Sequence, residues 1–146
     1  MFPVSRCGLH WKPGVYLIKP NLGELSSLRH SERLTEEQAS AIAKEFIAAG
    51  KCKVIVISMG EQGALLVTED STSLFRAPAV ERKSTVGAGD SMVAGIVYSL
   101  AMGRTLTDSV RYGVACGTAA TLNPGTALCR KEDADLFFHE IHPVQF

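Results

Sequence analysis

Short apolar runs alternate with helical stripes along most of the chain. Residues 15–18 form a β-prone run, and Pro20 ends it because proline cannot donate a hydrogen bond to a strand ladder. Residues 54–57 read Val-Ile-Val-Ile, a continuous β-branched run typical of a strand covered on both faces in an α/β protein. Two further runs, 64–68 and 73–77, flank a polar turn and predict an antiparallel hairpin.

Helical signals occupy most of the remaining chain. The segment 36–49 carries the fullest set: Thr35 and Gln38 are spaced as a capping box, Gly50 is a stop signal, and apolar residues recur on one face. The other predicted helices cover residues 22–28, 90–102, 107–122 and 131–141.

The order of these elements predicts the fold class. Residues 1–14 show neither helical nor strand periodicity, so we expect an irregular amino-terminal segment followed by one domain over residues 15–146. Strand, helix, strand, hairpin and then consecutive helices make an α/β arrangement, whose ligands gather at the carboxyl ends of the strands.

Composition narrows the function classes. The 146 residues are 46% apolar and 21% charged, values typical of a folded globular protein. Fifteen basic residues balance fifteen acidic ones, so no nucleic-acid partner is expected. Residues 92–102 form the longest strongly apolar stretch, about half the length a membrane span needs. Neither a membrane partner nor a secretory signal is expected.

The spacing of the four cysteines indicates the redox conditions in which the protein is expected to work. Cys7, Cys52, Cys116 and Cys129 are not spaced as a metal knuckle or a CxxC redox motif. This usage favours a reduced, cytoplasmic protein, with Cys116 as a packing residue on a helix of small residues.

The strongest chemical signal is the turn Ser84-Thr85-Val86-Gly87-Ala88-Gly89-Asp90, which feeds a helix. Its glycines let the backbone approach a ligand, and the first amides of the helix suit a phosphoryl group. Asp90, in the first helical turn, could accept a proton from an attacking hydroxyl. The alternative is an aspartate that only stabilises the helix start.

Two other loops follow predicted strands. Asn21 and Glu24 would share a face of a short helix and suit Mg²⁺, or would simply cap that helix. The loop 58–63 would admit a nucleotide, or would only make a tight turn. Neither a Walker nor a Rossmann glycine motif is present.

Taken together and in this order, the three loops resemble those of the PfkB-type (ribokinase-like) carbohydrate kinases. The segments KPNLGEL, SMGEQGAL, STVGAGDSMVAG and RYGVACGTAATLNPGTALC are most similar to the 6-phosphofructokinase branch of that family. Ser84 and Met92 stand where many relatives carry Asp and Phe, which also favours that branch. The likeness covers about residues 15–141 and only the carboxyl-terminal half of the family's fold.

The resemblance implies a role for each matching position. Asp90 corresponds to the general base, and Gly87, Ala88 and Gly89 correspond to the anion hole for the transferred phosphoryl group. The remaining correspondences are Asn21 and Glu24 with Mg²⁺, Lys19 and Asn21 with the phosphates of ATP, Ser58, Met59, Gly60, Glu61, Gln62 and Gly63 with the nucleotide loop, Val114 and Thr118 with adenine, and Ser84, Val86, Ala120, Asn123 and Gly125 with a monovalent cation, K⁺.

One departure from the family is large. The first strands of the ribokinase-like three-layer αβα fold, its sugar-binding segment and its β lid are not recognisable, so we expect a partial fold. The implied activity is transfer of the ATP γ-phosphoryl group to fructose 6-phosphate. The alternatives are a 1-phosphofructokinase, a tagatose-6-phosphate kinase, a ribokinase-like nucleoside kinase, or an inactive or partner-dependent fragment. A homo-oligomer or a complementary amino-terminal half is the expected protein partner.

Overall fold

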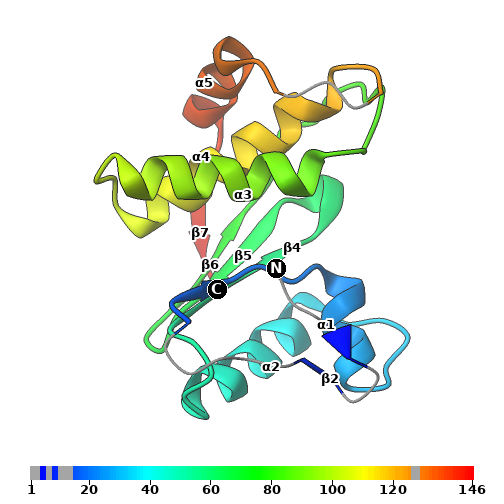
Figure 1. Cartoon of the computed structure of the whole chain (residues 1–146), viewed down its shortest axis with the longest axis vertical. Helices are drawn as coiled ribbons and strands as arrows, with labels where there is room; N and C mark the ends of the chain where they lie inside the picture. Colours follow the sequence, from blue (N-terminus) through cyan, green and yellow to red (C-terminus); the bar gives the residue numbers. More distant parts are fainter. Residues whose placement is uncertain (1–3, 6–7, 10–14, 126–128) are drawn as a thin grey trace. The chain divides into compact units, whose positions relative to one another are not determined.

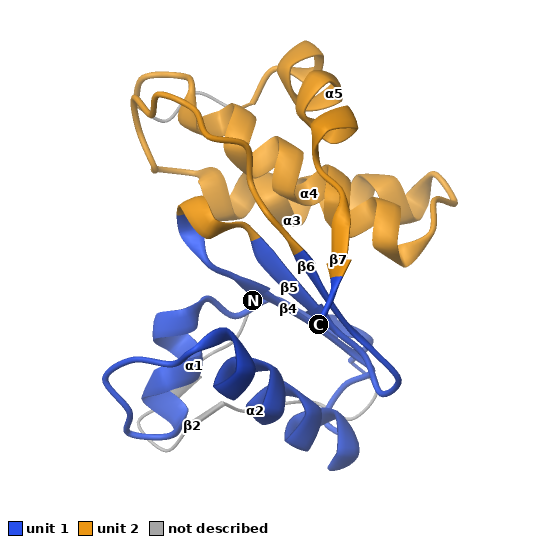
Figure 2. Cartoon of the chain, turned by 180° about the vertical axis from the view of Figure 1, so that it is seen from behind, with its two compact units in different colours: residues 1–60, 64–74, 145–146 blue, residues 61–63, 75–144 orange. Residues whose placement is uncertain are grey.

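The computed structural model describes residues 4–5, 8–9, 15–125 and 129–146 and divides into two compact units (Figure 2). The first unit comprises residues 1–60, 64–74 and 145–146, and the second comprises residues 61–63 and 75–144. One five-stranded sheet has the order β3-β4-β5-β6-β7. Its strands are β3 (Leu17–Ile18), β4 (Val54–Ser58), β5 (Ala64–Val67), β6 (Thr72–Phe75) and β7 (Pro143–Gln145).

In the first unit, β4 is an interior strand of the sheet. It pairs in parallel with β3, Leu17 opposite Val54, and antiparallel with β5, Ile57 opposite Leu65. All five residues of β4 are buried. A run of β-branched residues without polar alternation therefore ends up covered on both faces, as the sequence predicts.

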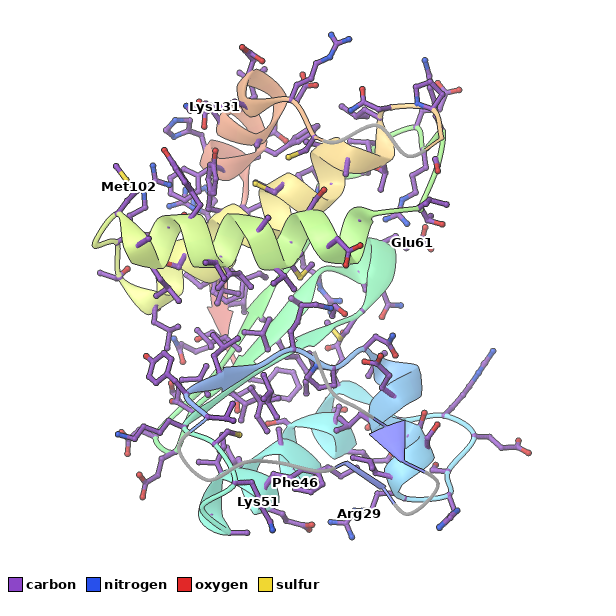
Figure 3. The ribbon with its side chains drawn as sticks, viewed as in Figure 1. Arg29, Phe46, Lys51, Glu61, Met102 and Lys131 are labelled. Carbon is purple, nitrogen blue, oxygen red and sulfur yellow. The ribbon has the colours of Figure 1, made fainter. Side chains whose placement is uncertain are left out.

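Two helices complete the first unit, α1 (Leu22–Leu28) and α2 (Glu36–Ala48), and α2 packs against β4 and β5 (Figure 1). The predicted capping box of α2 is present, because the Thr35 hydroxyl accepts a hydrogen bond from the Gln38 amide and the Gln38 side chain accepts one from the Thr35 amide. An ion pair between Arg29, labelled in Figure 3, and Glu45 links the two helices. The apolar core includes Leu25, Ala39, Ala43, Ile55, Ile57 and Leu65.

The second unit is built from α3 (Ala88–Ala101), α4 (Leu106–Thr121) and α5 (Lys131–Glu140), with α4 packed between its two neighbours. Small residues allow the close α3–α4 approach: a Cβ atom added to Gly113 would lie 2.5 Å from Ile96 Cγ1. Aromatic contacts join α4 to α5, where the Tyr112 and Phe138 rings meet edge to face at 5.8 Å.

The structure confirms the predicted helices and corrects several boundaries. Residues 22–28 are helical as predicted, whereas α3 begins two residues before the expected start at Asp90. The first strand of the sheet covers only Leu17–Ile18 of the expected 15–18, and β6 ends at Phe75 rather than 77.

Three strands are not anticipated by the sequence. Val4–Ser5 and Gly8–Leu9 pair as β1 and β2 inside the segment expected to be irregular. The exposed strand β7 begins at Pro143, and proline is tolerated at the first residue of a strand. The Phe146 amide donates to the Thr72 carbonyl at 3.0 Å, a contact that fixes the chain end beside β6 and has no local sequence signal.

Within the described part of the chain, none of the helices has both the length and the apolar character needed to pass through a membrane.

Candidate functional site

The carboxyl ends of β3 and β4 bring the first two candidate loops together in the first unit. The Ser58 amide donates to the Pro20 carbonyl at 2.9 Å, and Asn21 and Ser58 form a parallel bridge. The Lys19 ammonium donates to Ser58 Oγ at 3.1 Å. Parallel neighbours end at the same sheet edge, so Lys19, Asn21 and Ser58 are adjacent although almost forty positions separate the two segments.

Asn21 and Glu24 form a reciprocal capping box at the start of α1. Asn21 Oδ1 accepts from the Glu24 amide at 2.8 Å, and Glu24 Oε2 accepts from the Asn21 amide at 2.9 Å. The capping role considered from the sequence is therefore present. Both side chains are held at the strand ends with hard oxygen donors of the type Mg²⁺ prefers.

A magnesium ion at this position would keep most of its ligands as water and phosphate oxygens. Among the residues the structure describes, no three His, Cys, Asp or Glu side chains gather as a metal-binding group. An amide and a carboxylate that also cap a helix fit the water-mediated grip typical of Mg²⁺ at phosphates.

The loop after β4 combines buried and exposed positions. Met59 is part of the apolar core, whereas Gly60, Glu61 and Gln62 form an exposed 3₁₀ turn. Exposed Glu61, labelled in Figure 3, forms an ion pair with half-buried Arg82, with 3.8 Å between Glu61 Oε2 and Arg82 Nη1. Gly63 is required for packing, because an added Cβ atom would lie 1.8 Å from the Phe75 carbonyl oxygen. The tight-turn explanation therefore accounts for Gly63, and the exposed turn is the part that can meet a ligand.

The glycine turn before α3 lies in the second unit. Gly87 is the N-cap residue in the left-handed conformation, φ 81°, and no side chain caps the helix. The Ala88 amide donates to the Thr85 carbonyl at 3.3 Å. Within the described residues, the amides of Gly89 and Asp90 have no protein acceptor, and Asp90 is exposed. One of the three amides expected to face a phosphoryl group is therefore engaged in the turn, and Gly89 remains available.

The carboxyl end of α4 holds the beginning of this turn. The Thr121 carbonyl accepts hydrogen bonds from the Lys83 amide at 2.8 Å and the Ser84 amide at 3.3 Å. Ser84 Oγ in turn accepts from the Val86 amide at 3.2 Å. Of the candidate cation residues, Ser84 is thus bonded to the helix end that carries Ala120 and precedes Asn123 and Gly125, and Val86 is bonded to Ser84.

Val114 and Thr118 are buried in α4, 1% and 6% exposed. Thr118 Oγ1 donates to the Val114 carbonyl of the same helix at 2.9 Å. In this structure they are packing residues, and contact with adenine stays a prediction.

Two contributors have no clear signal in the sequence. The Thr121 carbonyl is a backbone acceptor, which any residue provides. Gly117 is one of several small residues of α4, and only the structure shows that a Cβ atom there would lie 3.2 Å from the Ala88 carbonyl oxygen. Its small size lets α4 approach the start of α3.

A family model for pfkB family carbohydrate kinases matches residues 4–133. The chain belongs to the pfkB family. An ATP-dependent 6-phosphofructokinase isozyme 2 of Mycobacterium tuberculosis is 44% identical over 129 residues, which are 88% of this chain and 38% of that protein. A 1-phosphofructokinase of Borreliella burgdorferi is 40% identical over 120 residues, covering 81% of this chain and 38% of that protein.

A solved structure supports the fold of this pfkB family chain. Phosphofructokinase-2 from Escherichia coli in complex with potassium superimposes with a TM-score of 0.80 at 42% identity, over 86% of this chain and 40% of that chain. The partial ribokinase-like α/β fold predicted from the sequence is confirmed. The chain spans about two fifths of the length of the relatives that it matches.

Proposed function

We propose that this chain provides the ATP-binding and proton-abstracting part of a sugar kinase that transfers the γ-phosphoryl group of ATP to fructose 6-phosphate. The observation that carries the proposal is the start of α3. There an exposed Asp90 lies one residue after the Gly89 amide, on a helix whose left-handed Gly87 N-cap leaves the end without a side-chain cap.

The residues of the candidate loops would each have a chemical role in this transfer. The Gly89 and Asp90 amides, at the positive end of the helix dipole, would bind the phosphoryl oxygens. The Asp90 carboxylate would accept the proton of the sugar hydroxyl as it attacks phosphorus. Lys19, held near Ser58, would stand beside the nucleotide phosphates. Mg²⁺, when bound near Asn21 and Glu24, would neutralise phosphate charge.

A matched pair of aspartates tests the role of Asp90. Asp90 and Asp108 both occupy the third position of a helix, α3 and α4 respectively. In the Asp90→Asn variant we expect turnover to fall about 10²- to 10⁴-fold, the usual contribution of a general base, with Mg-ATP binding retained. Asp108→Asn should leave turnover within about twofold, because among the described residues the Asp108 carboxylate forms an ion pair only with Arg111, at 3.7 Å. Equal losses in both variants would refute the assignment.

Binding is measured apart from turnover. Calorimetric titration of the chain with Mg-ATP, together with its melting temperature, should show an interaction at millimolar nucleotide, because a ligand that binds only the folded state stabilises it. The absence of both signals would contradict the nucleotide-binding proposal. Repeating the titration with K⁺ and with a large organic cation tests the cation residues around Ser84 and Asn123.

A second candidate is a fragment that acts only with a complementary amino-terminal polypeptide. The covered share of the relatives, 38% in the Mycobacterium tuberculosis protein, favours it. A coupled assay over fructose 6-phosphate, fructose 1-phosphate and tagatose 6-phosphate, with the chain alone and mixed with a complementary half, separates the candidates. Turnover by the chain alone would rule out the fragment.

A further inference from the structure

Two thiols belong to one hydrophobic cluster of the second unit. Cys116, on α4, is 4% exposed, and Cys129 packs against the same cluster, which also contains Tyr112, Ala119 and Ala134. Cys129 lies close enough to Cys116 to contribute to the raised pKa of that thiol, and both cysteines are free. Two free thiols that pack into one small cluster can form a disulfide when an oxidant is present.

We propose that Cys116 and Cys129 form a reversible disulfide when the protein meets a small-molecule disulfide oxidant such as oxidised glutathione. The bond would join Cys129, two residues before the start of α5, to Cys116 within α4. Residues 117–125, including Asn123 and Gly125, would then lie within a closed covalent loop. The proposal rests on this pair alone and stands apart from the proposed kinase function.

The exchange balances in two steps. The thiolate of Cys129 attacks one sulfur of oxidised glutathione, forms a mixed disulfide and expels one glutathione thiolate. Cys116, after losing its proton to solvent, then attacks the Cys129 sulfur and expels the second glutathione thiolate. The protein loses two protons and two electrons, and one oxidised glutathione becomes two reduced molecules.

The surroundings assign the order of attack. Cys129 is partly exposed, so an oxidant can reach its sulfur, whereas Cys116 is enclosed between helices. A Cβ atom added to Gly95 of α3 would lie 2.8 Å from Cys116 Sγ, which shows how closely α3 covers this thiol. Burial, with a smaller contribution from Cys129, raises the pKa of Cys116 to about 12. Since the thiolate is the nucleophile, Cys129 is the first attacker and Cys116 the second.

The sequence makes the test direct. Trypsin releases both cysteines in one peptide, residues 112–130, because no Lys or Arg lies between Tyr112 and Arg130, while Cys7 and Cys52 fall in other peptides. The full chain is equilibrated in glutathione buffers with and without urea, quenched with acid, alkylated and digested. The disulfide form of the peptide takes no label and is lighter by two hydrogens than the dithiol.

We expect half-oxidation of the native chain at a glutathione ratio at least about tenfold more reducing than in urea, equivalent to about 30 mV. A ratio equal to that in urea would overturn the proposal, because it would mean that folding does not bring the thiols into bonding geometry. A stable mixed disulfide on Cys129 in the unmodified chain would overturn it as well.

Variants separate the pair from the other cysteines. Cys116→Ala should stop at a mixed disulfide on Cys129, whereas Cys52→Ala, which removes a buried thiol of the first unit, should leave the half-oxidation ratio unchanged. Cys129→Ser provides a second test that retains the buried residue of α4. Its Cys116 should stay unmodified in the native chain, and rapid modification there would contradict the assigned order.

Discussion

Gly63 is the position where a single methyl group should do the greatest damage for a reason visible in the structure. Its φ is +100°, and an added Cβ atom would lie 1.8 Å from the Phe75 carbonyl oxygen and 2.9 Å from the Ala77 amide nitrogen. Both are backbone atoms, so no side-chain rotation relieves the clash. Phe75 is fully buried, and its backbone has no free space into which to move.

Gly60, three residues earlier in the same loop, is the matched control. Its φ is +58°, and an added Cβ atom there meets nothing within 4 Å. In the Gly60→Ala variant the free energy of unfolding should therefore fall only by the cost of holding alanine in the left-handed conformation, roughly 1–2 kcal/mol. The Gly63→Ala variant has that cost together with overpacking of about 1–3 kcal/mol, so a total of about 2–5 kcal/mol is expected.

Urea unfolding of the full chain, followed by far-ultraviolet circular dichroism, measures both variants against the unmodified chain. The expected result is a midpoint for Gly63→Ala well below that of Gly60→Ala, at an unchanged slope with urea. Equal midpoints would refute the reasoning, because they would mean that the loop relaxes around a Cβ atom at either position.

Three further expectations concern stability. Thr35→Ala should lower the free energy of unfolding by about 1 kcal/mol, because it removes the hydroxyl that caps α2, and Thr35→Ser should retain most of it in the same urea assay. Gly113→Ala should cost about 1–3 kcal/mol, because the new Cβ atom would lie 2.9 Å from the Met92 carbonyl oxygen as well as against Ile96; a melting temperature equal to that of the parent would contradict this. The Cys116 thiol has a folded pKa of about 12 against an ordinary value of 9.0, so the unfolded chain loses that proton first as pH rises. The stabilisation that comes from the raised pKa of Cys116 is complete below about pH 9 and disappears toward pH 12. Urea midpoints across this pH range should therefore fall more steeply in the unmodified chain than in the Cys116→Ala variant.

The local elements of the fold were predictable because their signals act within a few residues. The Thr35–Gln38 box, the Asn21–Glu24 spacing and the apolar run of β4 each report on their own segment. The order of the three loops likewise indicated the pfkB family. By contrast, β7 depends on hydrogen bonds from the last two residues to β6, about seventy positions away, which no local pattern encodes.

The candidate site divides in the same way. The sequence identified Asp90 at a helix start and Asn21 beside Glu24, because residue type and spacing carry that chemistry. The association of Val114 with adenine comes from the resemblance and stays a prediction, and the structure adds that this residue is buried in α4. Whether a side chain is exposed depends on the neighbouring helix, and the sequence of one helix does not contain that information.

The sequence by itself determined the order of the secondary structure, the helix ends and the residue types at the three loops, since capping, periodicity and glycine conformations are short-range effects. Tertiary structure alone decided that Gly63 faces the Phe75 carbonyl, that Thr121 holds the segment at Ser84, and that Cys129 packs against the cluster that contains Cys116. Each of these contacts joins atoms that are close only after the elements pack, because the geometry of packing depends on all the side chains in the interface together.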